Sequence, residues 1–131
     1  MKPTIFASLL LLLATSLVFA EDEQTGQPKI SYYEIKPSLV SNLASGGKYI
    51  RTDIQLMTKD DSFLESLELH GPAIRHTLLL LLSEQDGRTI KTPEGKEALR
   101  KEAMTQVSQV MKELSGKDSL QELYFTTFFV Q

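Results

Sequence analysis

An alternating segment at residues 49–57 restricts the fold of this chain more than any other feature. Ile50, Thr52, Ile54 and Leu56 share one side of this segment, and mainly polar residues occupy the other side. Successive side chains of a strand point to opposite faces of its sheet. The pattern therefore predicts a strand with one buried and one solvated face, whose buried side must be covered by other elements.

A second, interrupted strand is predicted over residues 29–43, immediately before the alternating segment. Its β-branched and aromatic residues suit a pleated surface. Pro37 has no amide hydrogen to donate, so it belongs at an edge or a bend. Ser45-Gly46-Gly47 is typical of a turn. We therefore expect the two strands to form a hairpin.

Three helices are predicted from their start and stop signals. Asp60 can cap the first helix, and Pro72 suits the first turn of the second, which contains the apolar run Leu78 to Leu82. This run is apolar all round, so part of it is expected to face a partner subunit. Thr92 can cap the longest helix, and Gly116 suits a left-handed stop at its end.

Two further strands are expected near the end of the chain. Arg88 to Ile90 is short and could be a strand, and Leu120 to Val130 is rich in aromatic residues. An apolar strand at a sheet edge would promote aggregation, so the second of these is placed at the centre of the sheet. The fold class is α+β: one small domain with an antiparallel or mixed sheet of three to four strands and two or three helices packed on it.

Residues 1–20 are predicted to be a signal peptide. Lys2 precedes the apolar residues 5–19, Ala20 ends a permitted cleavage site, and acidic residues follow. A short membrane anchor is the alternative, although about 20 apolar residues are needed to span a bilayer. Residues 21–28 are expected to be a flexible lead, and residues 29–131 the folded domain.

The charge and the absence of cysteine narrow the function. Removal of residues 1–20 would leave 13 basic and 17 acidic residues, a net charge of −4, with no basic block. Such a surface argues against nucleic acid and anionic lipid as partners. Without cysteine the domain cannot use disulfides, so it must depend on its own core or on assembly.

No pattern for catalysis, a cofactor or a metal is evident. His70 and His76 are six residues apart, which does not place them on one helical face as a zinc pair requires. No serine lies in a Gly-x-Ser-x-Gly turn. We therefore expect no catalytic, cofactor-binding or metal-binding residues, and no enzyme activity.

Long basic side chains on the predicted helices are the better candidates for protein contacts. Arg75, Lys96 and Arg100 are chosen because such side chains can reach a neighbouring subunit, and a solvated helix face is the alternative interpretation of the same residues. Charge reversal at Arg75 is expected to weaken assembly and leave thermal stability nearly unchanged.

Three segments resemble one known family. They are Pro72-Ala73-Ile74-Arg75 with the leucine run after it, Thr92-Pro93-Glu94-Gly95-Lys96-Glu97-Ala98-Leu99-Arg100, and Leu123-Tyr124-Phe125-Thr126-Thr127-Phe128-Phe129-Val130-Gln131. In this order and spacing they resemble FliL, the flagellar basal-body-associated family, over nearly all of residues 30–131.

The resemblance implies a scaffold and not an enzyme. In the FliL family, the periplasmic domains are similar to the stomatin or band-7 type of domain and form rings around stator units. It thus implies a motor accessory that supports motility, with stator and basal-body proteins and further copies of the chain as partners. It also implies a periplasmic location at the inner membrane and basal body, or a single-pass anchor in that membrane.

Two other functions remain open from the residues alone. One is a general periplasmic scaffold of the same fold in another envelope complex. The other is a small hydrolase or ligand-binding protein whose site follows no familiar motif.

Overall fold

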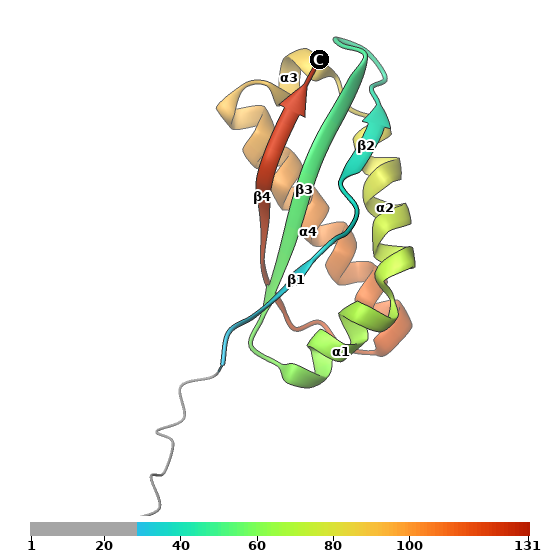
Figure 1. Cartoon of the computed structure of the whole chain (residues 1–131), viewed down its shortest axis with the longest axis vertical. Helices are drawn as coiled ribbons and strands as arrows, with labels where there is room; N and C mark the ends of the chain where they lie inside the picture. Colours follow the sequence, from blue (N-terminus) through green and yellow to red (C-terminus); the bar gives the residue numbers. More distant parts are fainter. Residues whose placement is uncertain (1–28) are drawn as a thin grey trace, which may run out of the picture.

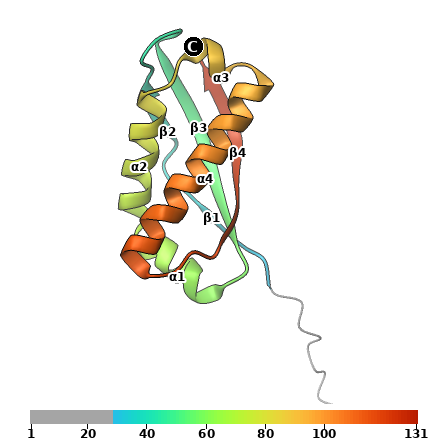
Figure 2. The same ribbon diagram turned by 180° about the vertical axis from the view of Figure 1, so that it is seen from behind.

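The computed structural model describes residues 29–131, so the predicted signal peptide and the segment up to Pro28 lie outside the described residues. A four-stranded antiparallel sheet has helices α2 (Gly71–Ser83) and α4 (Pro93–Ser115) on one face and an open second face (Figures 1 and 2). The elements are β1 (Ser31–Glu34), β2 (Leu39–Asn42), β3 (Tyr49–Thr58), α1 (Asp61–Leu69), α2 (Gly71–Ser83), α3 (Gly87–Ile90), α4 (Pro93–Ser115) and β4 (Leu120–Val130). This confirms the α+β class.

The alternating segment forms β3, and β3 is the centre of the sheet. Its inward side chains, Ile50, Thr52, Ile54, Leu56 and Thr58, are completely buried. β1 and β2 both pair with one side of β3, at its two ends, and β4 pairs with the other side. Only one face of the sheet is covered by helices, which explains why β3 alternates and is not apolar throughout.

The predicted hairpin and the interrupted strand are both confirmed. β2 pairs antiparallel with β3 from Leu39↔Thr52 to Asn42↔Tyr49. Pro37 lies between β1 and β2, where no ladder hydrogen bond is required of it.

The central position predicted for the last strand is wrong. Within the described residues, β4 pairs only with β3, so it is an edge strand of 11 residues. The prediction assumed that an apolar strand needs partners on both sides. Here the inward side chains of β4 pack on the core instead, with Leu123 fully buried and Phe125 and Phe128 half-buried.

The short strand predicted at Arg88 to Ile90 is also wrong, because Gly87–Ile90 forms helix α3. Asp86 caps this helix, since its carboxylate accepts a hydrogen bond of 2.8 Å from the Arg88 amide. The local cap therefore determines that this segment is helical. The segment is too short for its hydrophobic periodicity to distinguish a helix from a strand. With α3, residues 29–131 contain four helices and not the expected two or three.

The predicted ends of the long helices are confirmed. Asp60 accepts from the amides of Ser62 and Phe63, and Thr92 accepts from the amide of Gly95. Gly116 ends α4 with a φ of 73°, a left-handed conformation that glycine adopts without steric strain.

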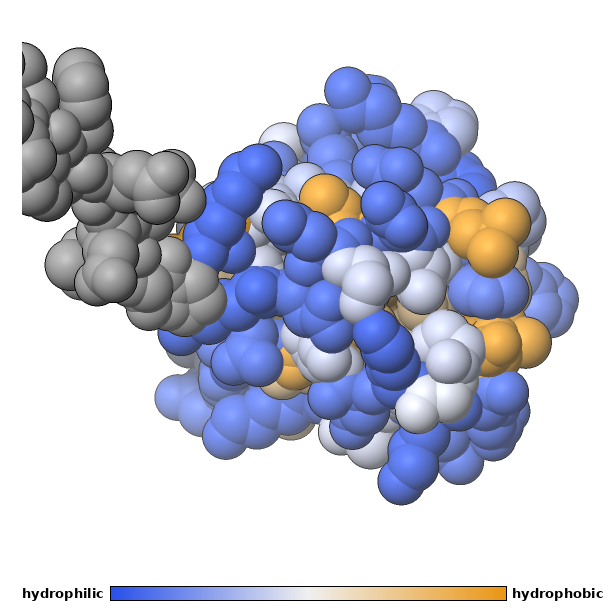
Figure 3. Space-filling view, turned by 90° about the horizontal axis from the view of Figure 1, so that it is seen from below, coloured by the Kyte–Doolittle hydropathy of each residue, from blue (hydrophilic) through white to orange (hydrophobic). Residues whose placement is uncertain are grey.

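The core lies between the sheet and the helices. In α4 the buried side chains are Leu99, Ala103, Val107 and Met111, whereas Leu114 in the last turn is 48 % exposed. From the end where β1 begins, the surface is mainly hydrophilic with separate apolar patches (Figure 3). Between residues 29 and 131, no helix has both the length and the apolar character needed to cross a membrane.

Candidate protein-interaction surface

Arg75 lies on α2 and reaches the connection between β1 and β2. Its guanidinium donates hydrogen bonds to the carbonyl oxygens of Pro37 and of Ser38, the second at 3.2 Å. These carbonyls belong to the interrupted edge of the sheet, where none of the described strands supplies donors. Arg75 therefore satisfies backbone acceptors at this edge, a role that the sequence did not indicate.

Arg100 has a similar role at the opposite edge. Its guanidinium binds the Glu97 carboxylate through two hydrogen bonds of 2.7 and 2.8 Å, and it also pairs with Glu122. A further bond of 3.3 Å reaches the carbonyl oxygen of Leu123 on β4. The hydrogen bonds to Glu97 are the main reason that the pKa of Arg100 is raised, and they lower the pKa of Glu97.

Lys96 lies one helical turn before Arg100 and is paired differently. Its ammonium group is 4.9 Å from the centre of the Phe128 ring, which is within cation–π range. Within the described part of the chain, it forms no ion pair with a carboxylate.

The structure brings two of the three candidate residues together and separates the third. Lys96 and Arg100 line a groove of about 310 Å³ between α4 and the edge of β4, which we call the α4–β4 groove. Its full lining is Pro93, Lys96, Glu97, Arg100, Tyr124 and Phe125. Arg75 lies at the other edge of the sheet, beyond β3.

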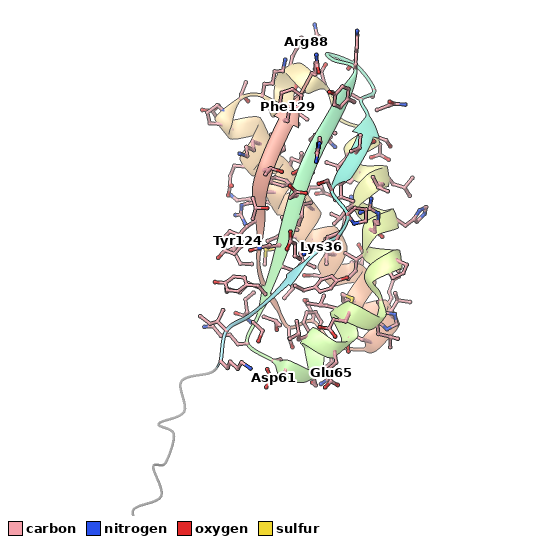
Figure 4. The ribbon with its side chains drawn as sticks, in the orientation of Figure 1. Lys36, Asp61, Glu65, Arg88, Tyr124 and Phe129 are labelled. Carbon is pink, nitrogen blue, oxygen red and sulfur yellow. The ribbon has the colours of Figure 1, made fainter. Side chains whose placement is uncertain are left out.

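The open face of the sheet carries aromatic side chains that are not among the residues predicted from the sequence to bind a partner. Tyr32 packs against Tyr124 with ring centres 6.5 Å apart, and Tyr49 packs against Phe129 at 6.2 Å. Figure 4 shows Tyr124 and Phe129 on β4. Alternation within residues 120–130 could have suggested an aromatic outer face, but the bulge at residue 126 breaks that alternation.

A polar cluster lies at the middle of this open face. Ser38 and Thr127 donate hydrogen bonds of 2.5 and 2.6 Å to the two carboxylate oxygens of Asp53. The bond from Ser38, followed by the bond from Thr127, lowers the pKa of Asp53. Because the carboxylate is stabilised in its ionised form, it is a weak proton acceptor. The cluster lies beside the bulge in β4.

The two histidines lie apart from this cluster. His70 forms the junction between α1 and α2, and His76 is exposed on α2. Among residues 29–131, no three potential metal ligands of the His, Cys, Asp or Glu type lie close enough to hold an ion.

Asp86 joins the β2–β3 turn to α3 and should control part of the acid stability. Ser45 and Arg88 bond its carboxylate, and the pKa of Asp86 falls from 3.8 to about 2, mainly because of the Arg88 side chain. The folded state therefore binds this proton less tightly, so Asp86 stabilises the fold above pH 3.8 and loses that effect toward pH 2. We expect Asp86→Asn to reduce the slope of stability against pH in this window, measured by urea unfolding. Parallel curves for the variant and the wild type would contradict this.

The fold and these surfaces define a single α+β domain with one helix-covered sheet face and one open face. The family model described as flagellar basal body-associated protein FliL matches residues 32–131. The chain therefore belongs to the FliL family, as its three segments had indicated.

Individual relatives are similar at moderate identity. The flagellar protein FliL of Aquifex aeolicus is 28 % identical over 101 residues, which is 76 % of this chain and 60 % of that protein. The flagellar proteins FliL of Escherichia coli K12 and of Shigella flexneri are each 29 % identical over 116 residues, covering 87 % of this chain and 75 % of theirs. The chain thus matches less than two thirds of the length of the Aquifex protein.

Proposed function

We propose that this protein is a non-enzymatic accessory of the flagellar motor, which associates with the basal body and the stator units and supports motility. The observation that supports this most directly is the extent of the family match. It begins at the second residue of β1 and ends at Gln131, so it includes every helix of the domain and nearly all of the sheet. The mechanism is binding: contacts that favour one state of a partner shift its equilibrium toward that state.

The protein acts, in this proposal, on the periplasmic side of the inner membrane. The signal-like residues 1–20 support export, with retention as a single-pass anchor as the alternative. The mass of the mature chain separates the two, because cleavage after Ala20 gives a chain that begins at Glu21.

Assembly into a ring of identical subunits is the second part of the proposal. Large apolar side chains remain exposed on the helices, with Leu69 at 74 %, Leu80 at 52 % and Leu114 at 48 %. Head-to-tail contacts between different surfaces can close into a ring. We expect self-association at micromolar concentration in analytical ultracentrifugation, and a monomer at high concentration would contradict the ring.

Crosslinking of the tagged protein in living cells, followed by mass spectrometry, tests the proposed partners. We expect stator or basal-body proteins among the captured chains. The matched control is the same tag on an unrelated exported protein, which should not capture them. Capture of other envelope proteins alone would favour a scaffold of another complex and contradict the flagellar role.

A further inference from the structure

The two edges of the sheet differ in how well they are protected against pairing. β1 and β2 have four residues each, Pro37 interrupts them, and Arg75 binds the carbonyls between them. Short strands, proline and bonded carbonyls all prevent the addition of another strand. This edge of the sheet is therefore poorly suited to the addition of a partner's strand.

The opposite edge, formed by β4, has little such protection. Residues 123–131 contain no charged residue and no proline. Arg100 bonds the carbonyl of Leu123, at the beginning of this stretch. Beyond it, a long uncharged edge strand is a template for pairing with another chain.

The hydrogen-bonding pattern identifies which groups of β4 point away from the sheet. Tyr49 and Gln131 exchange both backbone hydrogen bonds, at 3.0 Å each. In an antiparallel ladder such residues alternate with residues whose N–H and C=O groups point outward. Phe128 and Val130 face Thr52 and Ile50 at the alternate positions, so their backbone groups point to the free edge.

The α4–β4 groove runs beside this edge. The first turns of α4 project past β4 on the side away from β3, so one wall rises next to the strand (Figures 1 and 2). Pro93, Tyr124 and Phe125 give the groove apolar surface, and Lys96 adds an ammonium group without a carboxylate partner among the described residues. An apolar side chain and a carboxylate would both complement it.

The same projection argues against a second copy of this chain at the edge. Pairing of β4 with β4 of another copy would place the first turns of α4 over the inner face of the neighbouring sheet. The helices of the neighbour already cover that face, and a helix is about 10 Å wide whereas strands are only about 4.8 Å apart. A single extended segment has no helical layer and avoids this conflict.

We propose that the free edge of β4 binds an extended segment of a partner protein as an additional strand, with a carboxylate of that segment paired to Lys96. Its backbone bonds the outward groups of Phe128 and Val130, and alternate side chains enter the α4–β4 groove, as in other strand-addition complexes. The identity of the partner rests on the proposed flagellar function, whereas the site does not.

Site-specific photocrosslinking of the full chain in its own bacterium tests this site. A photoreactive phenylalanine analogue replaces Phe129 on β4 or, as the matched control, Val40 on β2. Both positions are exposed by about half on the open face, in the same row of the sheet and at opposite edges. We expect an adduct with a different protein from position 129 and none from position 40.

Two C-terminal extensions show whether that adduct depends on strand pairing. The first adds Thr-Asn-Gly-Thr and then Thr-Val-Glu-Val-Thr-Val-Thr after Gln131, so that the added Thr before Asn-Gly lies at the next outward-facing position and the extension can fold back as a hairpin on β4 at high effective concentration. The second replaces each valine of this extension with proline, which cannot complete the ladder. The first should abolish the adduct, and the second should retain it. Lys96→Glu should reduce the adduct about two- to fivefold, which is the range of an exposed ion pair.

Each outcome decides the proposal. No adduct from position 129, equal adducts from both positions, an adduct between two copies of this chain, or loss with both extensions would each overturn it. Capture of a non-flagellar protein with the expected dependence on the extensions would leave the strand-binding site in place. That result would contradict the flagellar function alone.

Discussion

Phe63→Ala should lower the free energy of unfolding by about 3–5 kcal/mol, the largest effect that we expect from one substitution. The ring of Phe63 is fully buried where α1 packs on the sheet and the other helices. Truncation removes apolar contacts and leaves a cavity that the neighbouring chain fills only in part. Because small domains have only about 5–15 kcal/mol of stability, the variant should be partly unfolded at growth temperature. Urea unfolding followed by circular dichroism measures the change.

Leu69→Ala is the matched control for this substitution, because Leu69 lies on the same helix and is 74 % exposed. It should change the free energy of unfolding by no more than about 0.5 kcal/mol. Equal losses in the two variants would show that α1 does not pack as described.

Arg75→Glu should lower the free energy of unfolding by about 1.5–3 kcal/mol. The guanidinium bonds the carbonyl oxygens of Pro37 and Ser38, and hydrogen bonds with a charged donor contribute in this range. A carboxylate at position 75 cannot donate, and it would repel these oxygens. The sequence alone led us to expect almost no change in thermal stability, and the contacts of Arg75 revise that expectation.

His76→Glu introduces the same carboxylate one residue later, at an exposed position of α2. It should leave stability within about 0.5 kcal/mol of the wild type. If Arg75→Glu also unfolds at the wild-type urea concentration, then the bonds to the β1–β2 connection do not contribute to the fold.

Local features of the chain were predictable because their causes are local. Asp60, Thr92 and Gly116 define helix ends through groups within a few residues of themselves. The buried face of β3 was predictable because buried and exposed side chains alternate along this one strand, and the alternation is visible in its own sequence. The leucine run is likewise mostly buried, with Leu78, Leu81 and Leu82 inside and Leu80 outside.

The order of the strands was not predictable in the same way. Whether β4 is central or at an edge depends on which strands lie beside it, and its sequence contains only its apolar character. An apolar composition of β4 is expected if one face of the strand packs on the core. It is equally expected if the strand lies at an edge that binds a partner.

The contacts of the candidate residues were likewise not predictable from the sequence. Arg75, Lys96 and Arg100 were chosen as long basic side chains on helices, and that pattern does not reveal what they reach. The partners of Arg75 are separated from it in the sequence by 38 and 37 positions. Those of Arg100 on β4 are separated from it by 22 and 23 positions. Only the folded arrangement shows that both arginines bond carbonyls at sheet edges and that Lys96 faces a groove.

Deletion of the gene, with swimming and filament assembly measured in the same cells, tests the central claim most directly. If the protein is a motor accessory that acts by binding, the deletion cells should still assemble filaments but swim more slowly or not at all. Swimming should recover when the wild-type chain is restored. The Phe63→Ala chain should fail to restore swimming, because the domain is destabilised. Normal swimming of the deletion strain, in dilute and in viscous medium, would contradict the proposed function.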